Sequence, residues 1–202
     1  MLDTYARKHV DIFINYFAKF FLKLRLKPNH ITILSLFIGI ISAIFSYNNY
    51  IYLAVILLWL SGLFDAVDGA MARISKQTSM FGTLMDVTFD RIVEILIIIS
   101  LSLNNIDSRF YMIILLSSII ISMTIFLTVG ALSSNNSIKS FRYQAGFAER
   151  SEGFIFLSLM IMFNDYLNII TILFAVAILF TASQRFLEAK KIFNEHENKQ
   201  RM

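Results

Sequence analysis

Six long apolar stretches, separated by short polar connections, dominate the chain from residue 31 onward. Their bounds are Ile31–Ser46, Tyr50–Arg73, Met80–Leu103, Phe110–Leu132, Gly146–Phe163 and Leu167–Ser183. The hydrocarbon core of a bilayer requires about 20 mostly apolar residues for each helix that crosses it. The pattern therefore predicts an all-α membrane protein with six transmembrane helices.

The segment before these stretches has a different, amphipathic pattern. Its apolar residues recur at spacings of three and four, which places them on one face of a helix; they are Ala6, Val10, Phe13, Phe17, Phe20 and Leu24. Such a helix suits the cytoplasmic membrane surface, where its cations meet anionic headgroups. A soluble helix packed on a protein core is the alternative. We predict an interfacial amphipathic helix over residues 1–26, a membrane domain over 27–186 and a charged cytoplasmic tail over 187–202.

The composition and the placement of the charges favour a membrane over nucleic acid as the partner. Hydrophobic residues make up 57% of the 202, charged residues only 16%, and the net charge is +4. Lysine and arginine gather before the first stretch, after the second and fourth, and in the tail, whereas the opposite connections carry only Arg109. By the positive-inside rule both termini are cytoplasmic. We expect a multi-pass protein of the cell inner membrane that binds no nucleic acid.

Four aspartates interrupt the second and third apolar stretches. Asp65 and Asp68 follow an apolar run too short to cross a bilayer comfortably, and the third stretch must include Asp86 and Asp90 to reach spanning length. All four are therefore expected at membrane depth, toward the cytoplasmic end. Ionisable residues inside a membrane are expensive and are functional candidates by default.

Helical geometry predicts that these acids meet. At about 100° per residue, each pair falls on one stripe of its helix. The short connection at 75–79 predicts that the two helices are antiparallel neighbours. Converging carboxylates repel one another unless cations lie between them, and oxygen ligands without cysteine or histidine favour Mg²⁺ or Mn²⁺ over zinc. Arg91 and Glu94, three residues apart, are expected to pair with each other or with neighbours.

The four acids belong to a longer motif with fixed spacing. The segment reads Asp65-Ala-Val-Asp68-Gly69-Ala-Met-Ala72-Arg73, then eight residues, Gly82, three residues, Asp86, three residues and Asp90. This resembles the complete signature of the CDP-alcohol phosphotransferase family, class I: D-x2-D-G-x2-A-R-x8-G-x3-D-x3-D. The resemblance extends to chain length, six spans, the amphipathic helix and Pro28-Asn29 before the first span. It implies a six-helix fold, usually a homodimer, with a site that opens toward the cytoplasmic leaflet.

The resemblance also implies roles for the motif residues. Asp65, Asp68 and Asp86 match metal ligands, and Asp90 matches the proposed general base, which in several members is a metal ligand too. Positions that accommodate the CDP moiety are matched by Gly69, Ala72, Arg73 and Gly82. The implied cofactors are two divalent cations, Mg²⁺ or Mn²⁺. The implied reaction moves a phosphatidyl group from a CDP-alcohol, foremost CDP-diacylglycerol, to a polar alcohol in the membrane and releases CMP.

The acceptor alcohol is less well specified. Arg142 and Arg150 are candidates for binding a phosphate on the acceptor. The segments 86–91 and 149–152 resemble the inositol-phosphate branch of the family, but that branch commonly has a second Glu-Arg pair, and Gly153 stands where its arginine would be. Inositol phosphate and glycerol 3-phosphate both stay open as acceptors. So does the reverse arrangement, in which a CDP-headgroup donor reacts with a lipid alcohol.

The alternative hypothesis, from a different class of function, is a cation transporter. A transport path normally has its acids near the bilayer midplane and often shows internal repeats. This chain has its acids at the cytoplasmic end and no repeat. The sequence therefore favours the enzyme.

Overall fold

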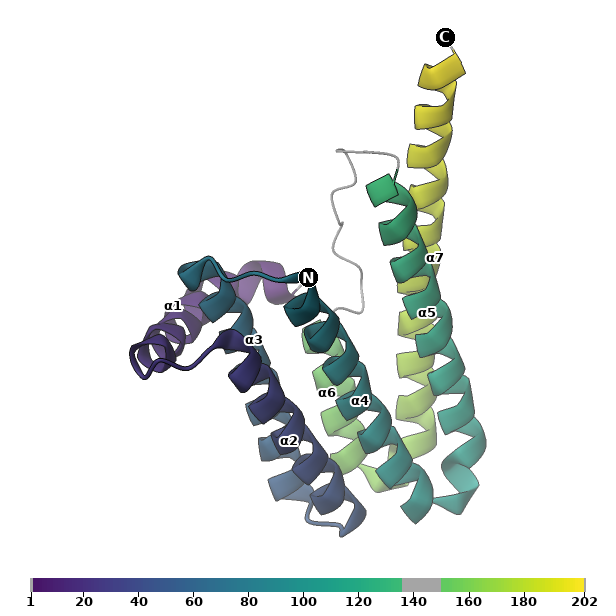
Figure 1. Ribbon diagram of the computed structural model, residues 1–202. Coiled ribbons are helices and arrows are strands. Elements are labelled where there is room, and N and C mark those ends of the chain that lie inside the picture. The colour runs from purple at the N-terminus through teal and green to yellow at the C-terminus, as the bar shows by residue number, and fades with distance from the viewer. Residues whose placement is uncertain (1, 136–149, 202) are drawn as a thin grey trace.

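The computed structural model describes residues 2–135 and 150–201, with side chains for 11–133 and 151–194, and the regular elements of those ranges are all helices (Figure 1). In chain order they are α1 (Leu2–Lys23), α2 (Pro28–Tyr47), α3 (Ile51–Ser75), α4 (Met80–Asn104), the 3₁₀ turn η1 (Ile106–Ser108), α5 (Arg109–Asn135), α6 (Arg150–Met162), the 3₁₀ turn η2 (Asn164–Tyr166) and α7 (Leu167–Arg201). The predicted all-α class is confirmed.

Within residues 2–135 and 150–201, four helical segments are long and apolar enough to cross a membrane. They are Pro28–Tyr47, Ile51–Ser75, Ile106–Ser133 and Asn164–Asn194. α4 is also long enough to cross a membrane, with 25 residues, but it is less apolar because it carries four ionisable residues. α6 has 13 residues, and the expected start of its span, at residues 146–149, lies outside the described ranges. The helices thus fall where the apolar stretches predict them, and the number of six crossings stays a prediction.

Local chemistry explains where the helices near the acids begin and end. α2 begins with Pro28, whose fixed φ suits the first helical position and whose missing N–H costs nothing there. α3 ends before Lys76, which adopts a left-handed conformation with φ 55°. α4 begins after Ser79, whose hydroxyl accepts a hydrogen bond from the Gly82 N–H at 2.9 Å. These caps confine the connection between α3 and α4 to four residues.

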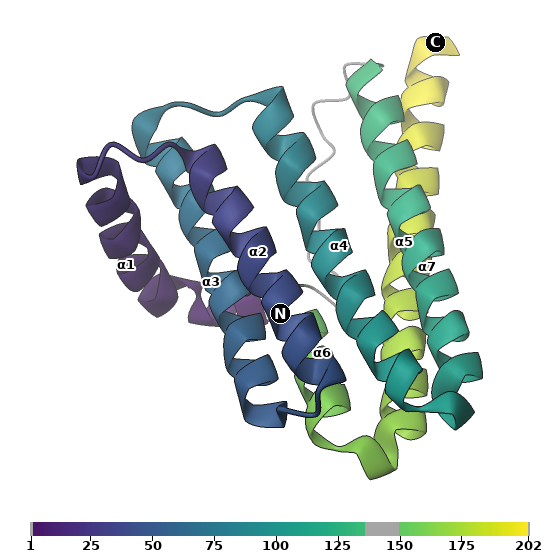
Figure 2. The same cartoon turned by 60° about the horizontal axis from the view of Figure 1, so that its bottom comes forward.

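The helix α2 packs extensively on both α3 and α4, whereas α3 and α4 hardly contact each other over their lengths. The two run in opposite directions, as expected (Figure 2). They are neighbours at the acids, where carboxylate oxygens of Asp65, Asp68 and Asp86 lie within 4.8 Å of one another, but they do not pack along their lengths, because a short connection fixes the direction of the next helix and not its packing partner. α5 and α7 form a second closely packed pair, and α6 contacts α3, α4 and α7.

The helix α1 carries apolar side chains on two sides, where the sequence predicts one apolar face. Phe17, Ala18 and Phe21 pack on the bundle, and the Phe21 ring lies 5.8 Å from the Phe64 ring of α3, centre to centre. Ile12, Phe13, Tyr16, Phe20 and Leu24 are exposed. α1 is therefore docked on the bundle by one side and presents apolar side chains on another.

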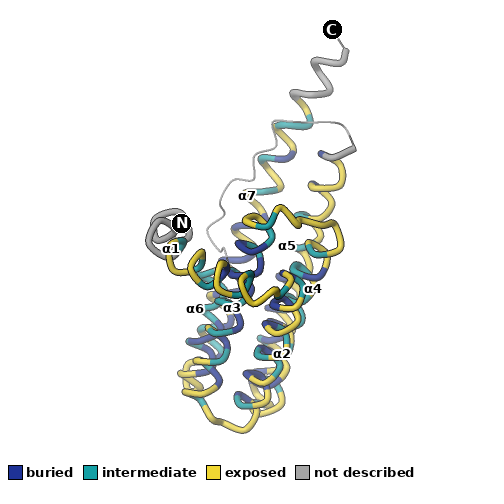
Figure 3. The backbone as a smooth tube through the Cα atoms, turned by 60° about the vertical axis from the view of Figure 1, so that its left-hand side comes forward, coloured by how far each residue is buried: buried dark blue, intermediate teal, exposed yellow. Residues whose placement is uncertain are grey.

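Buried residues lie along the inner sides of the helices, and the outer sides are largely exposed and apolar (Figure 3). An exposed apolar exterior is what a bilayer requires. α7 continues without a break from the last apolar stretch into the charged tail and extends past the end of α5 (Figure 1).

Candidate metal and nucleotide site

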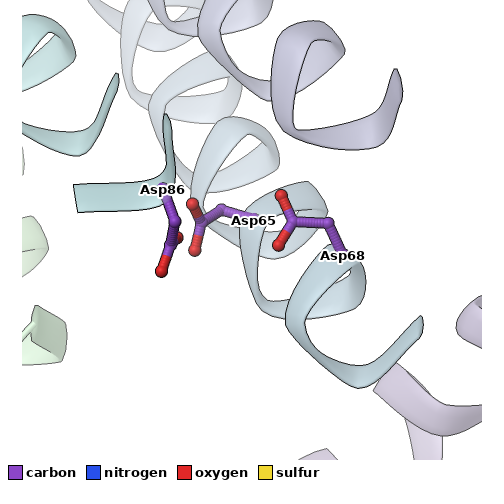
Figure 4. Close-up of side chains that lie close together, drawn as sticks. All are labelled: Asp65, Asp68 and Asp86. Atoms are coloured by element: carbon purple, nitrogen blue, oxygen red, sulfur yellow. The ribbon is translucent and has the colours of Figure 1, made fainter. Parts of the chain in front are cut away.

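Three aspartate carboxylates from two helices come together near one end of the bundle. Asp65 and Asp68 stand on α3 and Asp86 on α4, and one carboxylate oxygen of each lies within 4.8 Å of the others. Figure 4 shows Asp65 between Asp86 and Asp68. Asp65 and Asp68 are buried, with 4% and 5% of their surface exposed, and Asp86 is half-buried. The structure thus brings together the three residues that the sequence predicts as metal ligands.

The charge of this cluster requires compensation. Two unit negative charges at such a separation repel by about 3 kcal/mol at an effective dielectric constant of ~20, and burial adds a desolvation cost for each ionised carboxylate. A hard divalent cation offsets both terms, and carboxylate oxygens are the ligands that Mg²⁺ and Mn²⁺ prefer. The donor set therefore fits the cations expected from the sequence.

Asp90 stands one helical turn beyond Asp86 on α4 and is half-buried. It is not part of the three-carboxylate group. Its position on the same stripe of α4 as Asp86 agrees with the helical spacing of the motif. Asp90 is thus adjacent to the cluster along α4 but distinct from it.

The small residues of the motif leave room beside the carboxylates. A side chain at Gly69 would contact the Arg73 guanidinium, with its Cβ 3.4 Å from one terminal nitrogen. Ala72 is half-buried and Arg73 is exposed. Glycine at position 69 therefore lets the Arg73 side chain lie against α3. The exposed Arg73 guanidinium is accessible to an anionic ligand on this face of the helix.

Gly82 lies where the first turns of α2 and α4 meet. A Cβ there would stand 3.0 Å from the Ser79 hydroxyl and 3.4 Å from the side-chain oxygen of Asn29. The backbone of α4 can approach α2 this closely because position 82 has no side chain. In the sequence, Asn29 stands out only as part of the family pattern. Its closeness to Gly82 depends on how α2 packs on α4, which the sequence does not show.

Arg91 and Glu94 form an ion pair on α4, as expected. Glu94 is buried, and the Arg91 side chain is 35% exposed. A paired arginine provides the countercharge that a buried glutamate needs inside a membrane domain. The pair explains how α4 carries these two further ionisable groups within the bundle.

The predicted acceptor residues are described only in part. Arg142 lies outside the described residues, and Arg150 begins α6 with a side chain outside them. Gly153, one turn into α6, faces α7, since a Cβ there would lie 3.9 Å from the Phe174 ring. Arg150 is thus the first residue of α6 that the structure describes.

A contact between α3 and α6 was not foreseen from the sequence. The Trp59 indole N–H donates to the Ser158 hydroxyl at 3.0 Å, and the Phe154 ring packs against Gly62, where an added Cβ would stand 2.7 Å from the ring. Both contacts lie within two turns of Asp65 on α3. The single tryptophan of the chain is the signal that marks this interface.

Comparison with known proteins places the chain among lipid-synthesising transferases. A family model described as CDP-alcohol phosphatidyltransferase matches residues 25–184. An archaetidylinositol phosphate synthase of Pyrococcus horikoshii is 31% identical over 171 residues, 83% of this chain and 86% of that protein. A phosphatidylinositol phosphate synthase of Corynebacterium glutamicum is 33% identical over 96 residues, 46% of this chain and 43% of that protein.

A third relative is an uncharacterised protein of Aquifex aeolicus, 34% identical over 95 residues, or 47% of this chain and 46% of that protein. The chain therefore spans less than half the length of the Corynebacterium and Aquifex relatives. The alignment with the Pyrococcus protein covers most of both chains.

Two crystal structures of the phosphatidylinositol phosphate synthase of Mycobacterium tuberculosis share the fold. The structure with CDP-DAG bound has a TM-score of 0.65 and 24% identity, and covers 87% of this chain and 92% of that chain. The complex with manganese and citrate has a TM-score of 0.65 and 23% identity, and covers 87% and 88%. At these identities the likeness concerns the arrangement of the helices.

Proposed function

The chain belongs to the CDP-alcohol phosphatidyltransferase family, and from this premise we propose that it transfers a phosphatidyl group from CDP-diacylglycerol to an inositol phosphate, releasing CMP. One observation carries the proposal: three carboxylates at the family's signature spacing converge from α3 and α4. The relatives add support for the substrates, because the Pyrococcus and Corynebacterium proteins are synthases of inositol phosphate lipids and the Mycobacterium enzyme binds CDP-DAG.

Asp65, Asp68 and Asp86 would hold divalent cations, with two expected from the family resemblance. The manganese complex of the Mycobacterium enzyme supports this choice of metal. When bound there, the cations would supply positive charge against the pyrophosphate of the donor and the departing CMP. The side chains around the cations are proposed to carry out the remaining steps of the reaction.

Asp90 is proposed as the general base. It accepts the proton of the acceptor hydroxyl while that oxygen attacks the β-phosphorus of CDP-diacylglycerol, and the bond from phosphorus to the CMP oxygen breaks. Direct attack needs no covalent enzyme intermediate. Gly69 and Gly82 let the backbone approach the nucleotide, with Ala72 beside them, and Arg73 pairs with donor phosphate.

Arg142 and Arg150 are proposed to bind the phosphate of the acceptor. Two guanidinium groups recognise phosphate through charge-assisted hydrogen bonds. A second candidate acceptor, glycerol 3-phosphate, is favoured by Gly153, because that position lacks the arginine common in the inositol-phosphate branch. Both acceptors carry a phosphate, so the role of the arginines is the same for each.

We further propose that the protein crosses the cell inner membrane six times as a homodimer, with both termini in the cytoplasm. α4 and α6 complete the six crossings, and α1 lies at the cytoplasmic interface. The exposed Phe13 and Phe20 support this place for α1, since aromatic side chains on an amphipathic helix insert at the headgroup boundary.

The proposed function is tested by an acceptor panel. Purified protein in detergent is incubated with CDP-diacylglycerol, Mn²⁺ and one of inositol phosphate, glycerol 3-phosphate, inositol or serine, and CMP release is followed. We expect inositol phosphate to give the fastest release. Fastest release with inositol or serine would contradict the phosphate-bearing acceptor. Turnover of a CDP-headgroup donor with diacylglycerol, but not of CDP-diacylglycerol, would establish the reverse arrangement.

A further inference from the structure

The two helices that carry the acidic cluster are held together through a third. α3 and α4 hardly contact each other, yet oxygens of Asp65, Asp68 and Asp86 lie within 4.8 Å of one another. Each of the two helices packs extensively on α2. α6 also contacts both helices, but less extensively, so the separation of the carboxylates depends mainly on how α2 packs against α3 on one side and against α4 on another.

Hydrogen bonds fix α3 on α2 one turn before the first aspartate. The Ser35 hydroxyl donates to the Ser61 carbonyl oxygen at 2.8 Å, and the Ser61 hydroxyl donates to the Ser35 carbonyl oxygen at 2.9 Å. Both serines are buried, with 6% and 3% exposed. Ser61 is four residues before Asp65, so this reciprocal pair fixes the rotation and height of α3 directly below the cluster.

Van der Waals contact sets the distance between α2 and α4 at the same level. A Cβ built on Gly39 of α2 would stand 2.3 Å and 2.8 Å from the two methyl carbons of Val93 on α4, and 3.1 Å from the Ser61 hydroxyl. Val93 is buried, with 5% exposed. Position 39 is thus where α2, α3 and α4 meet, and even one methyl group does not fit there.

We propose that Gly39 is a positioning residue for the metal site: its missing side chain lets Val93 seat α4 close enough for Asp86 to join Asp65 and Asp68. Val93 lies one turn from Asp90 and two turns from Asp86 along α4. The inference rests on the proposed function, because it assigns a purpose to the spacing of the proposed metal ligands. Gly39 itself touches neither metal nor substrate.

The side chains around position 39 cannot easily move to make room for a methyl group. Valine is stiff at χ1, and both of its methyl carbons lie within the overlap, so a rotamer change does not relieve it. The helix axis of α4 has to move away from α2. Functional constellations require side chains placed within about 0.5 Å, and Mg²⁺-type sites demand near-ideal ligand geometry, so such a displacement weakens metal binding.

The test measures Mn²⁺ affinity of the full-length protein in detergent by isothermal titration calorimetry. We expect Gly39→Ala to weaken Mn²⁺ binding at least tenfold. Gly130→Ala is the matched control, because no atom of the described residues lies within 4 Å of a Cβ at that position of α5; it should bind as the parent does. In the double variant Gly39→Ala/Val93→Ala both overlapping methyl groups are gone, and we expect most of the lost affinity to return.

Two outcomes overturn the proposal: parental Mn²⁺ affinity in folded Gly39→Ala, or a double variant no better than Gly39→Ala. Failure of the parent to bind Mn²⁺ would instead refute the proposed metal site itself, so the two failures are distinguishable. If Gly39→Ala does not fold, Ser61→Ala replaces it, since it removes the hydrogen bonds of the Ser61 hydroxyl to the carbonyl and the hydroxyl of Ser35 and adds no bulk. We then expect a two- to tenfold weaker affinity, and parental affinity would contradict the positioning role.

Discussion

The aspartates of the motif differ in their position relative to the cluster, and the roles proposed for them follow this difference. Asp65, Asp68 and the half-buried Asp86 belong to the three-carboxylate group, whereas Asp90, also half-buried, stands one turn beyond Asp86 on α4. A carboxylate with two others nearby needs a cation to remain ionised. A carboxylate beside such a group is placed to exchange a proton with a substrate hydroxyl. Metal binding and base catalysis are therefore expected to respond differently to single substitutions.

The first prediction compares amide variants of these residues. Asp65→Asn, Asp68→Asn and Asp86→Asn each remove one ligand charge and should lower both Mn²⁺ affinity and turnover. Asp90→Asn should lower kcat by about 10²- to 10⁴-fold, the usual contribution of a general base, while Mn²⁺ and CDP-diacylglycerol affinities stay near parental. Calorimetry and CMP release measure the two properties. Equal loss of Mn²⁺ binding in all four variants would make Asp90 an ordinary ligand.

The second prediction concerns the acceptor arginine at the start of α6. Removing one charge-assisted phosphate contact costs roughly 1.5–3 kcal/mol, about ten- to a hundredfold in affinity. Arg150→Ala should raise the KM for inositol phosphate by that factor and leave the KM for CDP-diacylglycerol nearly unchanged, because Arg73 serves the donor. Lys139→Ala is the control for general loss of positive charge, because Lys139 lies three residues before Arg142 in the same connection between apolar stretches. An unaltered acceptor KM in Arg150→Ala would disprove the phosphate contact.

At the residue scale, the spacing of the motif was sufficient to identify the acidic cluster. Helical periodicity alone places Asp65 and Asp68 on one stripe, and Asp86 and Asp90 on another. The contact between Gly39 and Val93 was not predictable, since it depends on how two helices are rotated against each other, and neither residue carries a chemical signal. The same holds for the ring of Phe154 above Gly62.

Most ends of the described helices lie within a few residues of the predicted ones; the exception is α7, which continues to Arg201 instead of ending near Ser183. Long apolar runs and capping residues such as Pro28 and Ser79 give their ends. The packing partners of the helices were not predictable. Small residues on α2 allow two helices to pack closely on it at once, and helix association within membranes depends on such close approach rather than on the order of the helices in the chain. α6 illustrates the same point, since it reaches the site by docking on α3 and not on its neighbour in the chain, α5.

The third prediction tests this docking of α6. In Ser158→Ala the indole N–H of Trp59 loses its partner, and an unsatisfied donor in a partly buried interface costs about 1–3 kcal/mol. The thermal unfolding midpoint in detergent should fall by several degrees. Ser117→Ala is the matched control, because that exposed hydroxyl bonds only to its own helix, at the Ile113 carbonyl oxygen. Equal midpoints for both variants would show that the Trp59 contact does not hold α6.

At the scale of the whole molecule, one end of the bundle carries the chemistry. The acidic cluster, Arg73, the Ser79 cap and the start of α6 all lie toward the end where the connection between α3 and α4 stands, and α1 lies near that end (Figures 1 and 2). The opposite end has short turns around η1 and η2. The proposed reaction joins a membrane lipid to a soluble phosphate, so it needs such a polar end at a membrane surface, which we propose to be the cytoplasmic one.

The fourth prediction assigns the sides of the membrane. The chain has no cysteine, so Gln77→Cys and Asp107→Cys each introduce a single thiol at an exposed position on opposite ends of the bundle. In intact cells a membrane-impermeant maleimide should label Asp107→Cys, and Gln77→Cys should react only after the membrane is permeabilised. The reverse pattern would place the acidic cluster outside the cytoplasm.

The most direct measurement follows both products of the proposed reaction while the metal is controlled. Purified protein is chelated exhaustively, supplied with CDP-diacylglycerol and inositol phosphate, and analysed by mass spectrometry with and without Mn²⁺. We expect phosphatidylinositol phosphate and CMP in equal amounts with Mn²⁺, and neither without it, because the three carboxylates cannot serve the donor pyrophosphate unaided. Full turnover by the chelated protein, or CMP without the lipid product, would contradict metal-dependent phosphatidyl transfer.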